Sequence, residues 1–111
     1  MNAPTKTVLL LGRRHSVVDD AERQAEQLHL PGIHLFEATT IDDVRSAFAQ
    51  TKIDHVIMGA GIDLETRLQI IREIFQTSDS TSVHMKDRAS GPAGFLPFIQ
   101  SLLRALDEQP S

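Results

Sequence analysis

The stretch His55-Val-Ile-Met-Gly-Ala-Gly-Ile-Asp-Leu-Glu65 joins a short apolar run to a glycine turn and then to the start of an amphipathic pattern. A continuous apolar run of this kind indicates a strand that is covered on both faces. Asp63 is a suitable helix N-cap, and Glu65 falls in the first helical turn, where the helix dipole favours an acidic side chain. The stretch therefore predicts a strand at 53–58, a turn at 59–61 and a helix that begins after Asp63.

The helix that follows this turn carries apolar side chains at helical spacing. Such a wide apolar stripe is typical of a helix that packs deeply on a sheet. We expect six residues to form its buried face: Leu64, Leu68, Ile70, Ile71, Ile74 and Phe75.

The same alternation of strand and helix runs through the rest of the chain. Thr40 followed three residues later by Asp43 forms a capping-box pattern, and Ser16 with Asp19 forms another. Pro31-Gly32 is expected to end the first helix. The remaining predicted strands lie at 7–12, 33–37 and 83–85, and the remaining predicted helices at 16–30, 40–51 and 95–106.

Four strand-helix units in series predict an α/β fold with three layers and helices on both faces of the sheet. We expect a short doubly wound, flavodoxin-like or Rossmann-like domain with a four-stranded parallel sheet in the order 2-1-3-4. A length of 111 residues suits a single domain over 1–111, with flexible ends at 1–6 and 107–111.

Composition excludes several classes of function. The chain has no cysteine, which excludes disulfides and thiolate metal sites and favours a reducing, cytoplasmic location. A net charge of −4 and the absence of Tyr and Trp argue against a nucleic-acid partner. The apolar run near the N-terminus is too short for a signal peptide, and no run reaches the length of a membrane span. We therefore expect no membrane partner.

Ligands of open parallel sheets bind outside the carboxyl ends of the strands, where the strand order reverses. In this fold that point lies between the first and third strands. Arginine side chains and helix N-termini at such an edge suit a phosphate or carboxylate group, although the charges could also be solvated loop residues. The predicted anion-binding residues, which we call the basic rim, are Gly12, Arg13, Arg14, His15, Ser16, Gly59, Ala60, Gly61, Lys86, Arg88, Ser90 and Gly91.

The Gly59-Ala-Gly61 turn lies between a predicted strand and a predicted helix, as the dinucleotide-binding fingerprint does. Leu64 stands where the third small residue of that fingerprint belongs. A lone pair of glycines is weak evidence, and a tight turn is the simpler interpretation. No cofactor is therefore assigned, and a nucleotide or NADP-like ligand stays an alternative.

The histidines form no recognised metal-binding motif. His55 begins the third predicted strand and His84 lies within the fourth, so we expect strand geometry to keep them apart, and no metal site is predicted. His15 lies between Arg14 and Ser16 on the basic rim, where neighbouring cations favour a neutral ring that could act as a base. The sequence supplies no evident orienting carboxylate unless Asp87 reaches it, so the catalytic residues stay unassigned.

The outline resembles the flavodoxin-like class and, more specifically, a shortened response-regulator receiver. The ending Lys86-Asp-Arg with Phe95-Leu-Pro-Phe-Ile-Gln-Ser-Leu-Leu is similar to the last strand and helix of receivers. Receivers carry an acidic pair after the first strand, where this chain has Gly12-Arg13-Arg14. They end the third strand with a phosphoacceptor Asp, where this chain has Gly59. The resemblance therefore implies a fold and no phosphotransfer chemistry or Mg²⁺ site.

Two functions follow from these observations. The first is a small non-enzymatic regulatory or interaction module that self-associates as a homodimer, either through an edge strand or through the last two helices. Its support is the absence of a complete catalytic constellation and the apolar last helix. The alternative is a binder or an enzyme for a phosphorylated or carboxylated small molecule, held on the basic rim. Whether the protein is an enzyme is left open.

Overall fold

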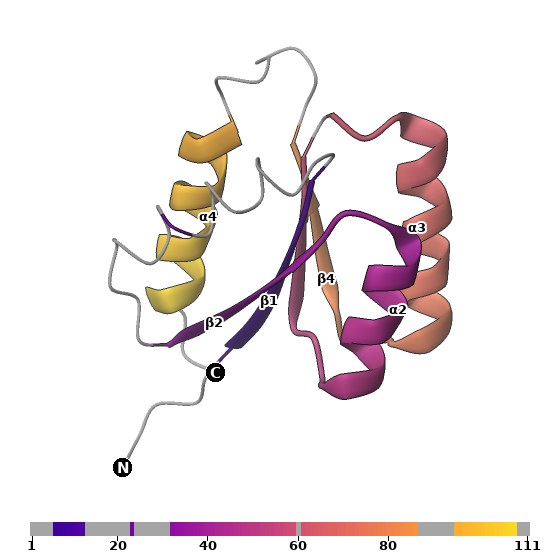
Figure 1. Ribbon diagram of the computed structural model, residues 1–111. Helices are drawn as coiled ribbons and strands as arrows, with labels where there is room; N and C mark the ends of the chain where they lie inside the picture. Colours follow the sequence, from indigo (N-terminus) through magenta and orange to yellow (C-terminus); the bar gives the residue numbers. More distant parts are fainter. Residues whose placement is uncertain (1–5, 13–22, 24–31, 60, 87–94, 109–111) are drawn as a thin grey trace.

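The computed structural model describes residues 6–12, 23, 32–59, 61–86 and 95–108. One parallel sheet contains β1 (Lys6–Leu11), β2 (Ile33–Ala38), β3 (His55–Met58) and β4 (Ser82–Met85) (Figure 1). Its strand order is β2-β1-β3-β4, so the predicted parallel sheet and its order are confirmed. The predicted helix at 16–30 lies outside the described residues, except for Arg23, which is helical.

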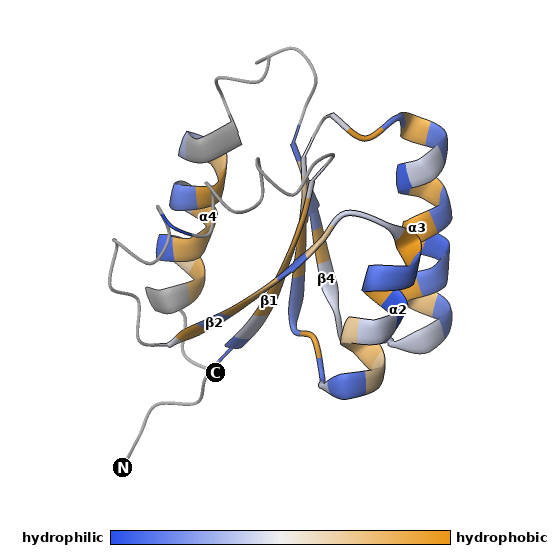
Figure 2. Ribbon diagram, viewed as in Figure 1, coloured by the Kyte–Doolittle hydropathy of each residue, from blue (hydrophilic) through white to orange (hydrophobic). Residues whose placement is uncertain are grey.

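The described helices cover both faces of the sheet. Helices α2 (Ile41–Gln50) and α3 (Leu64–Thr77) lie together on one face, and α4 (Phe95–Glu108) lies on the other (Figure 1). The predicted three-layer α/β arrangement is therefore confirmed. Figure 2 shows that α4 directs its hydrophobic residues towards the sheet.

Strand β1 occupies the middle of the sheet because its apolar run can be buried on both faces. Its register with β2 runs from Lys6 opposite Ile33 to Leu11 opposite Ala38, and it pairs with β3 on its other side. The four residues Val8–Leu11 are fully buried. Because side chains alternate along a strand, they supply both faces of the sheet with core residues.

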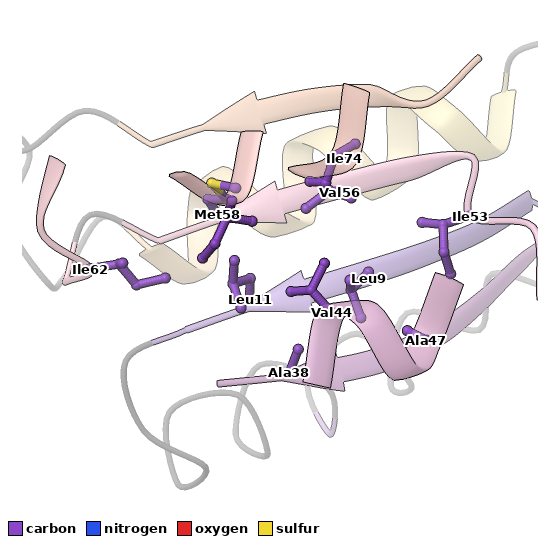
Figure 3. Close-up of a cluster of buried hydrophobic side chains, with 11 residues drawn as sticks. Leu9, Leu11, Ala38, Val44, Ala47, Ile53, Val56, Met58, Ile62 and Ile74 are labelled. Atoms are coloured by element: carbon purple, nitrogen blue, oxygen red, sulfur yellow. The ribbon is translucent and has the colours of Figure 1, made fainter. Parts of the chain in front are cut away.

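Each face of the sheet has its own hydrophobic core. On the α2–α3 face, Figure 3 shows Val44 and Ala47 of α2 turned towards Leu9 of β1. The complete cluster on this face is Leu9, Leu11, Ala38, Val44, Ala47, Ile53, Val56, Met58, Ile62, Ile70 and Ile74. On the other face, the buried cluster is Val8, Leu10, Ile57, Ile99, Leu103 and Leu106.

The predicted helix starts of α2 and α3 are confirmed. Thr40 caps α2, and its side chain accepts a hydrogen bond from the Asp43 amide while the Asp43 carboxylate bonds back to the cap backbone. Asp63 caps α3 and accepts from the amide of Thr66. These caps satisfy amide groups that have no partner within the helix, so they fix where each helix begins.

The predicted buried face of α3 is partly wrong. Leu64, Leu68 and Phe75 are 53%, 49% and 51% exposed, whereas Ile70 and Ile74 are buried. The third side chain that α3 buries is the cation Arg67. The apolar surface of this helix is wider than the area that the sheet covers. Only one side of it meets the core, and the other side forms an exposed apolar row.

Candidate functional site

Three residues of the predicted basic rim lie together at the carboxyl edge of the sheet. The amide of Gly12 donates to the Ala38 carbonyl at 3.2 Å, and the amide of Gly59 donates to the Leu11 carbonyl at 2.9 Å. The amide of Lys86 donates to the Met58 carbonyl at 3.0 Å. These bonds continue the ladders between the strands by one residue, so Gly12, Gly59 and Lys86 line one edge. All three are buried.

The other rim residues divide into two groups. Gly61 lies in the turn before α3 and is exposed. The rest lie outside the described residues: Arg13, Arg14, His15, Ser16, Ala60, Arg88, Ser90 and Gly91. The anion-binding role of the rim therefore stays a prediction.

Sequence reasoning missed Arg67, a second buried cation at this edge. Arg67 is 6% exposed and Lys86 is 3% exposed. The Arg67 Nη1 atom donates to the Lys86 carbonyl at 3.4 Å. The guanidinium of Arg67 therefore reaches from α3 to the end of β4. The available signal was spacing, because Arg67 shares a helical face with Ile70 and Ile74. A charged residue on a buried face needs an explanation.

The guanidinium of Arg67 is incompletely satisfied. Its Nε atom is buried and has no hydrogen-bond partner among the residues that the structure describes. Buried donors are nearly always paired, because a donor removed from water without a partner costs free energy. This unpaired donor is the most unusual polar feature in the described part of the chain.

The helix end nearest to Arg67 already carries a negative charge. Asp63 Oδ1 accepts from the Thr66 hydroxyl at 2.6 Å, and its Oδ2 accepts from the Thr66 amide at 3.2 Å. These two bonds lower the pKa of Asp63 below its ordinary value, and the positive charge of Arg67 adds to the effect. Asp63 is therefore ionised at neutral pH. As the cap of α3, it partly neutralises the positive end of the helix dipole.

The expectation that His55 and His84 lie apart was wrong. The His55 Nδ1 atom lies 3.2 Å from the His84 Nε2 atom. His84 is opposite Ile57, two residues beyond His55, so the two histidines are diagonal neighbours on one face of the sheet. A diagonal contact depends on strand register, which sequence spacing does not reveal. Within the described residues, no group of three or more histidine or acidic side chains could hold a metal ion.

Burial lowers the pKa of both His55 and His84 below the ordinary value for histidine. The charge of His84 lowers the pKa of His55 further, while the carboxylate of Asp54 acts in the opposite direction. Both rings are therefore neutral at pH 7, and one ring can donate a hydrogen bond to the other. A neutral pair of this kind could accept a proton when the pH falls.

A small cavity of about 180 Å³ lies between α2 and α3. Its lining residues are Val44, Arg45, Phe48, Ala49, Glu73, Ile74 and Thr77. Arg45 and Glu73 connect the two helices by an ion pair of 2.7 Å. The cavity is smaller than a typical small-molecule site and holds no reactive cluster, so the carboxyl edge of the sheet is the better candidate site.

The sequence matches no family model, and no curated protein resembles it closely enough to count as a match. Functional inference therefore depends on the residues themselves. None of the described helices combines the length and the apolar character that crossing a membrane requires.

Proposed function

We propose that this protein is a non-enzymatic interaction module that pairs with a second copy of itself through α3 and β4. The observation that carries this proposal is the position of its exposed large apolar side chains. Among the residues that the structure describes, all four lie on α3 or β4: Leu64, Leu68, Phe75 and Met85. We call these four residues the α3–β4 patch.

The three helical members of the patch form a continuous row. Leu68 follows Leu64 by four residues and Phe75 follows Leu68 by seven, so they lie on one side of α3. Partly buried Ile71 fills the gap between them. The row extends roughly 16 Å along the helix, at about 1.5 Å per residue. Contiguous apolar surface on this scale marks interaction sites more often than isolated exposed residues do.

Met85 extends the patch from the helix to the sheet. Val83 packs against the core on the α2–α3 face, and Met85 lies two residues further along β4, so its side chain is on the same face. Strand β4 is at the end of the sheet, and no described strand pairs with its outer side. The patch therefore lies beside a sheet edge, a frequent place of association between chains.

The charges beside the row favour a second copy as the occupant. Glu65 and Arg72 are exposed and lie seven residues apart on the same flank of α3. Neither forms an ion pair with another described residue. When two copies of α3 pack antiparallel about a twofold axis, the same flank of each helix faces the other. Glu65 of one copy then meets Arg72 of the second copy, and this contact occurs twice.

The same arrangement matches the apolar residues. An antiparallel pair that is centred between Leu68 and Ile71 places Leu64 opposite Phe75 of the second copy. It also places Leu68 opposite Ile71 of the second copy. The row is thus complementary to itself in the order of its apolar residues and in charge, as an isologous interface requires. A cytoplasmic location is part of this proposal, and its support is the absence of cysteine from the chain.

The ligand-binding function that the sequence also suggests is the second candidate. The observation that favours it is the presence of two buried cations, Arg67 and Lys86, at the carboxyl edge of the sheet. It concerns the buried side of α3 and the strand ends, whereas self-association concerns the exposed side. The two functions are therefore compatible, and each has its own test.

Sedimentation velocity over a range of concentrations tests self-association. We expect the native chain to approach twice its monomer mass of 12.3 kDa as the concentration rises. Leu68→Glu should stay monomeric and keep the native circular dichroism spectrum, because Leu68 is half exposed. Ser101→Glu, at an exposed position of α4 on the other side of the sheet, is the matched control and should pair normally. A native chain that stays monomeric at high concentration would exclude the proposal.

A further inference from the structure

The carboxyl edge of the sheet contains a cation whose hydrogen-bonding capacity is largely unused. Arg67 is more than nine-tenths buried, and its Nη1 atom makes the only hydrogen bond of the guanidinium to another described residue. That bond is long, at 3.4 Å. A guanidinium removed from water is normally satisfied by several acceptors or by an anion. The described residues around Arg67 thus supply fewer acceptors than the side chain can use.

The unused part of the guanidinium has the geometry that an oxyanion needs. Nε and Nη2 form one of the two-pronged faces of this group, and Nη1 lies outside that face. Nε is buried without an acceptor and Nη1 donates to the Lys86 carbonyl, so no bond from this face to a described residue is formed. Two parallel N–H groups of arginine match the two oxygens of a carboxylate or a phosphate.

No described acidic side chain forms an ion pair with Arg67, so a direct contact does not neutralise its positive charge. The charge of Arg67 acts on Asp63, but the Asp63 carboxylate is already held by the Thr66 amide and hydroxyl. Lys86 adds a second buried positive charge to the same edge.

From these contacts we infer that Arg67 forms the centre of a binding site for a single oxyanion group, phosphate or carboxylate, of a small molecule. The Nε–Nη2 face of Arg67 binds two oxygens of that group, and Lys86 strengthens the positive field around it. The inference names a residue within the second candidate function. It does not depend on self-association, which uses the exposed row of α3 and not its buried face.

The test is a titration of the native chain with inorganic phosphate and, separately, with citrate, at constant ionic strength adjusted with chloride. We expect saturable chemical-shift changes at the Gly59 and Gly61 amides and a rise in melting temperature. A response to phosphate alone, to citrate alone or to both supports the site and identifies the preferred oxyanion. No saturable response to either anion overturns the inference.

Three variants separate a binding role of Arg67 from a purely structural one. Arg67→Met should weaken binding by roughly tenfold or more, because a charge-assisted pair is lost. Arg67→Lys keeps the charge and removes the two-pronged face, so it should also weaken binding, and it serves if the methionine variant does not fold. Arg104→Met, exposed on α4, should bind as the native chain does. Native affinity in folded Arg67→Met or Arg67→Lys would overturn the inference, and sedimentation of these variants reports self-association independently.

Discussion

The imidazole rings of His55 and His84 face each other across β3 and β4, with 3.2 Å between Nδ1 of His55 and Nε2 of His84. Their ring centroids are 5.4 Å apart. Burial is the main cause that lowers the pKa of each ring, and the charge of His84 opposes a proton on His55. The folded protein therefore binds protons at this pair less readily than the unfolded chain does.

This pair predicts a loss of stability in weakly acidic solution. A histidine with a lowered folded pKa contributes stability above its unfolded value near 6.5. That contribution is lost as the pH falls from about 6.5 through the folded pKa, because the unfolded chain then takes up more protons. We expect the urea midpoint to decrease from pH 8 to pH 5, and the double variant His55→Gln with His84→Gln to show a flatter dependence.

The control for the pH experiment is His34→Gln, because His34 is exposed on the opposite edge strand of the sheet. It should leave the pH dependence close to that of the native chain. If the double variant has the same slope as the native chain between pH 8 and pH 5, the histidine pair is not the cause of the acid sensitivity.

The Thr40–Asp43 capping box predicts a second, more acidic transition. The Thr39 amide, which donates to Asp43 Oδ2 at 3.0 Å, is the main cause that holds the pKa of Asp43 below its ordinary value of 3.8. Its stabilising effect is present above that value and is lost as the pH falls below it. We expect Asp43→Asn to lower the unfolding free energy at pH 7 by about 1 kcal/mol, the usual net contribution of one hydrogen bond.

Urea unfolding at two pH values checks this prediction. The difference between Asp43→Asn and the native chain should shrink near pH 3, where the native carboxylate is also protonated. Asp42→Asn is the matched control, because Asp42 is a neighbouring acidic residue of the same helical turn and lies outside the capping box. An effect of Asp42→Asn as large as that of Asp43→Asn would show that general charge, and not the capping box, is responsible.

The features that could be predicted from the sequence depend on residues close together in the chain. The capping box joins residues three apart, and the strand order follows from the alternation of strands with helices. The run at 7–12 could be placed in the middle of the sheet because consecutive apolar side chains are typical of a strand that is buried on both faces. Four residues of this run are fully buried in the structure. Local chemistry and chain topology were sufficient for these inferences.

The features that could not be predicted depend on how elements meet in space. His55 and His84 touch because register places them diagonally, and register is not visible from their spacing of 29 residues. Arg67 is buried, although a cation within an apolar pattern usually faces solvent. Its burial follows from the rotation of α3 on the sheet. That rotation also leaves Leu68 exposed, so one packing choice explains both observations.

A pair of leucine variants measures which apolar residues belong to the core. Leu103 of α4 is fully buried, so Leu103→Ala should lower the unfolding free energy by about 2–5 kcal/mol. Leu68→Ala removes the same atoms from a half-exposed position and should cost less than about 1 kcal/mol in dilute solution, where pairing is weak. Urea unfolding at low protein concentration compares the two. Equal losses would mean that the exposed row of α3 is covered within one molecule.

The antiparallel pairing of α3 makes a prediction about mixtures of two charge variants. Glu65→Arg leaves only positive side chains on the flank of the row, and Arg72→Glu leaves only negative ones. Each variant alone should pair about three- to tenfold more weakly than the native chain, because two attractive contacts become repulsive. An equimolar mixture should form a mixed dimer, since every contact across that interface again joins opposite charges.

Sedimentation of each variant alone, of the mixture and of the doubly exchanged variant separates this geometry from other modes of association. The double variant Glu65→Arg with Arg72→Glu regenerates both contacts within one sequence, so it should pair with nearly native affinity. Arg104→Glu, on the opposite side of the sheet, alters the net charge without touching the row and should leave pairing unchanged. A parallel arrangement places different flanks against each other, so the mixture would then pair no better than its components. Antiparallel packing of α3 would be excluded by that result even if the native chain is a dimer.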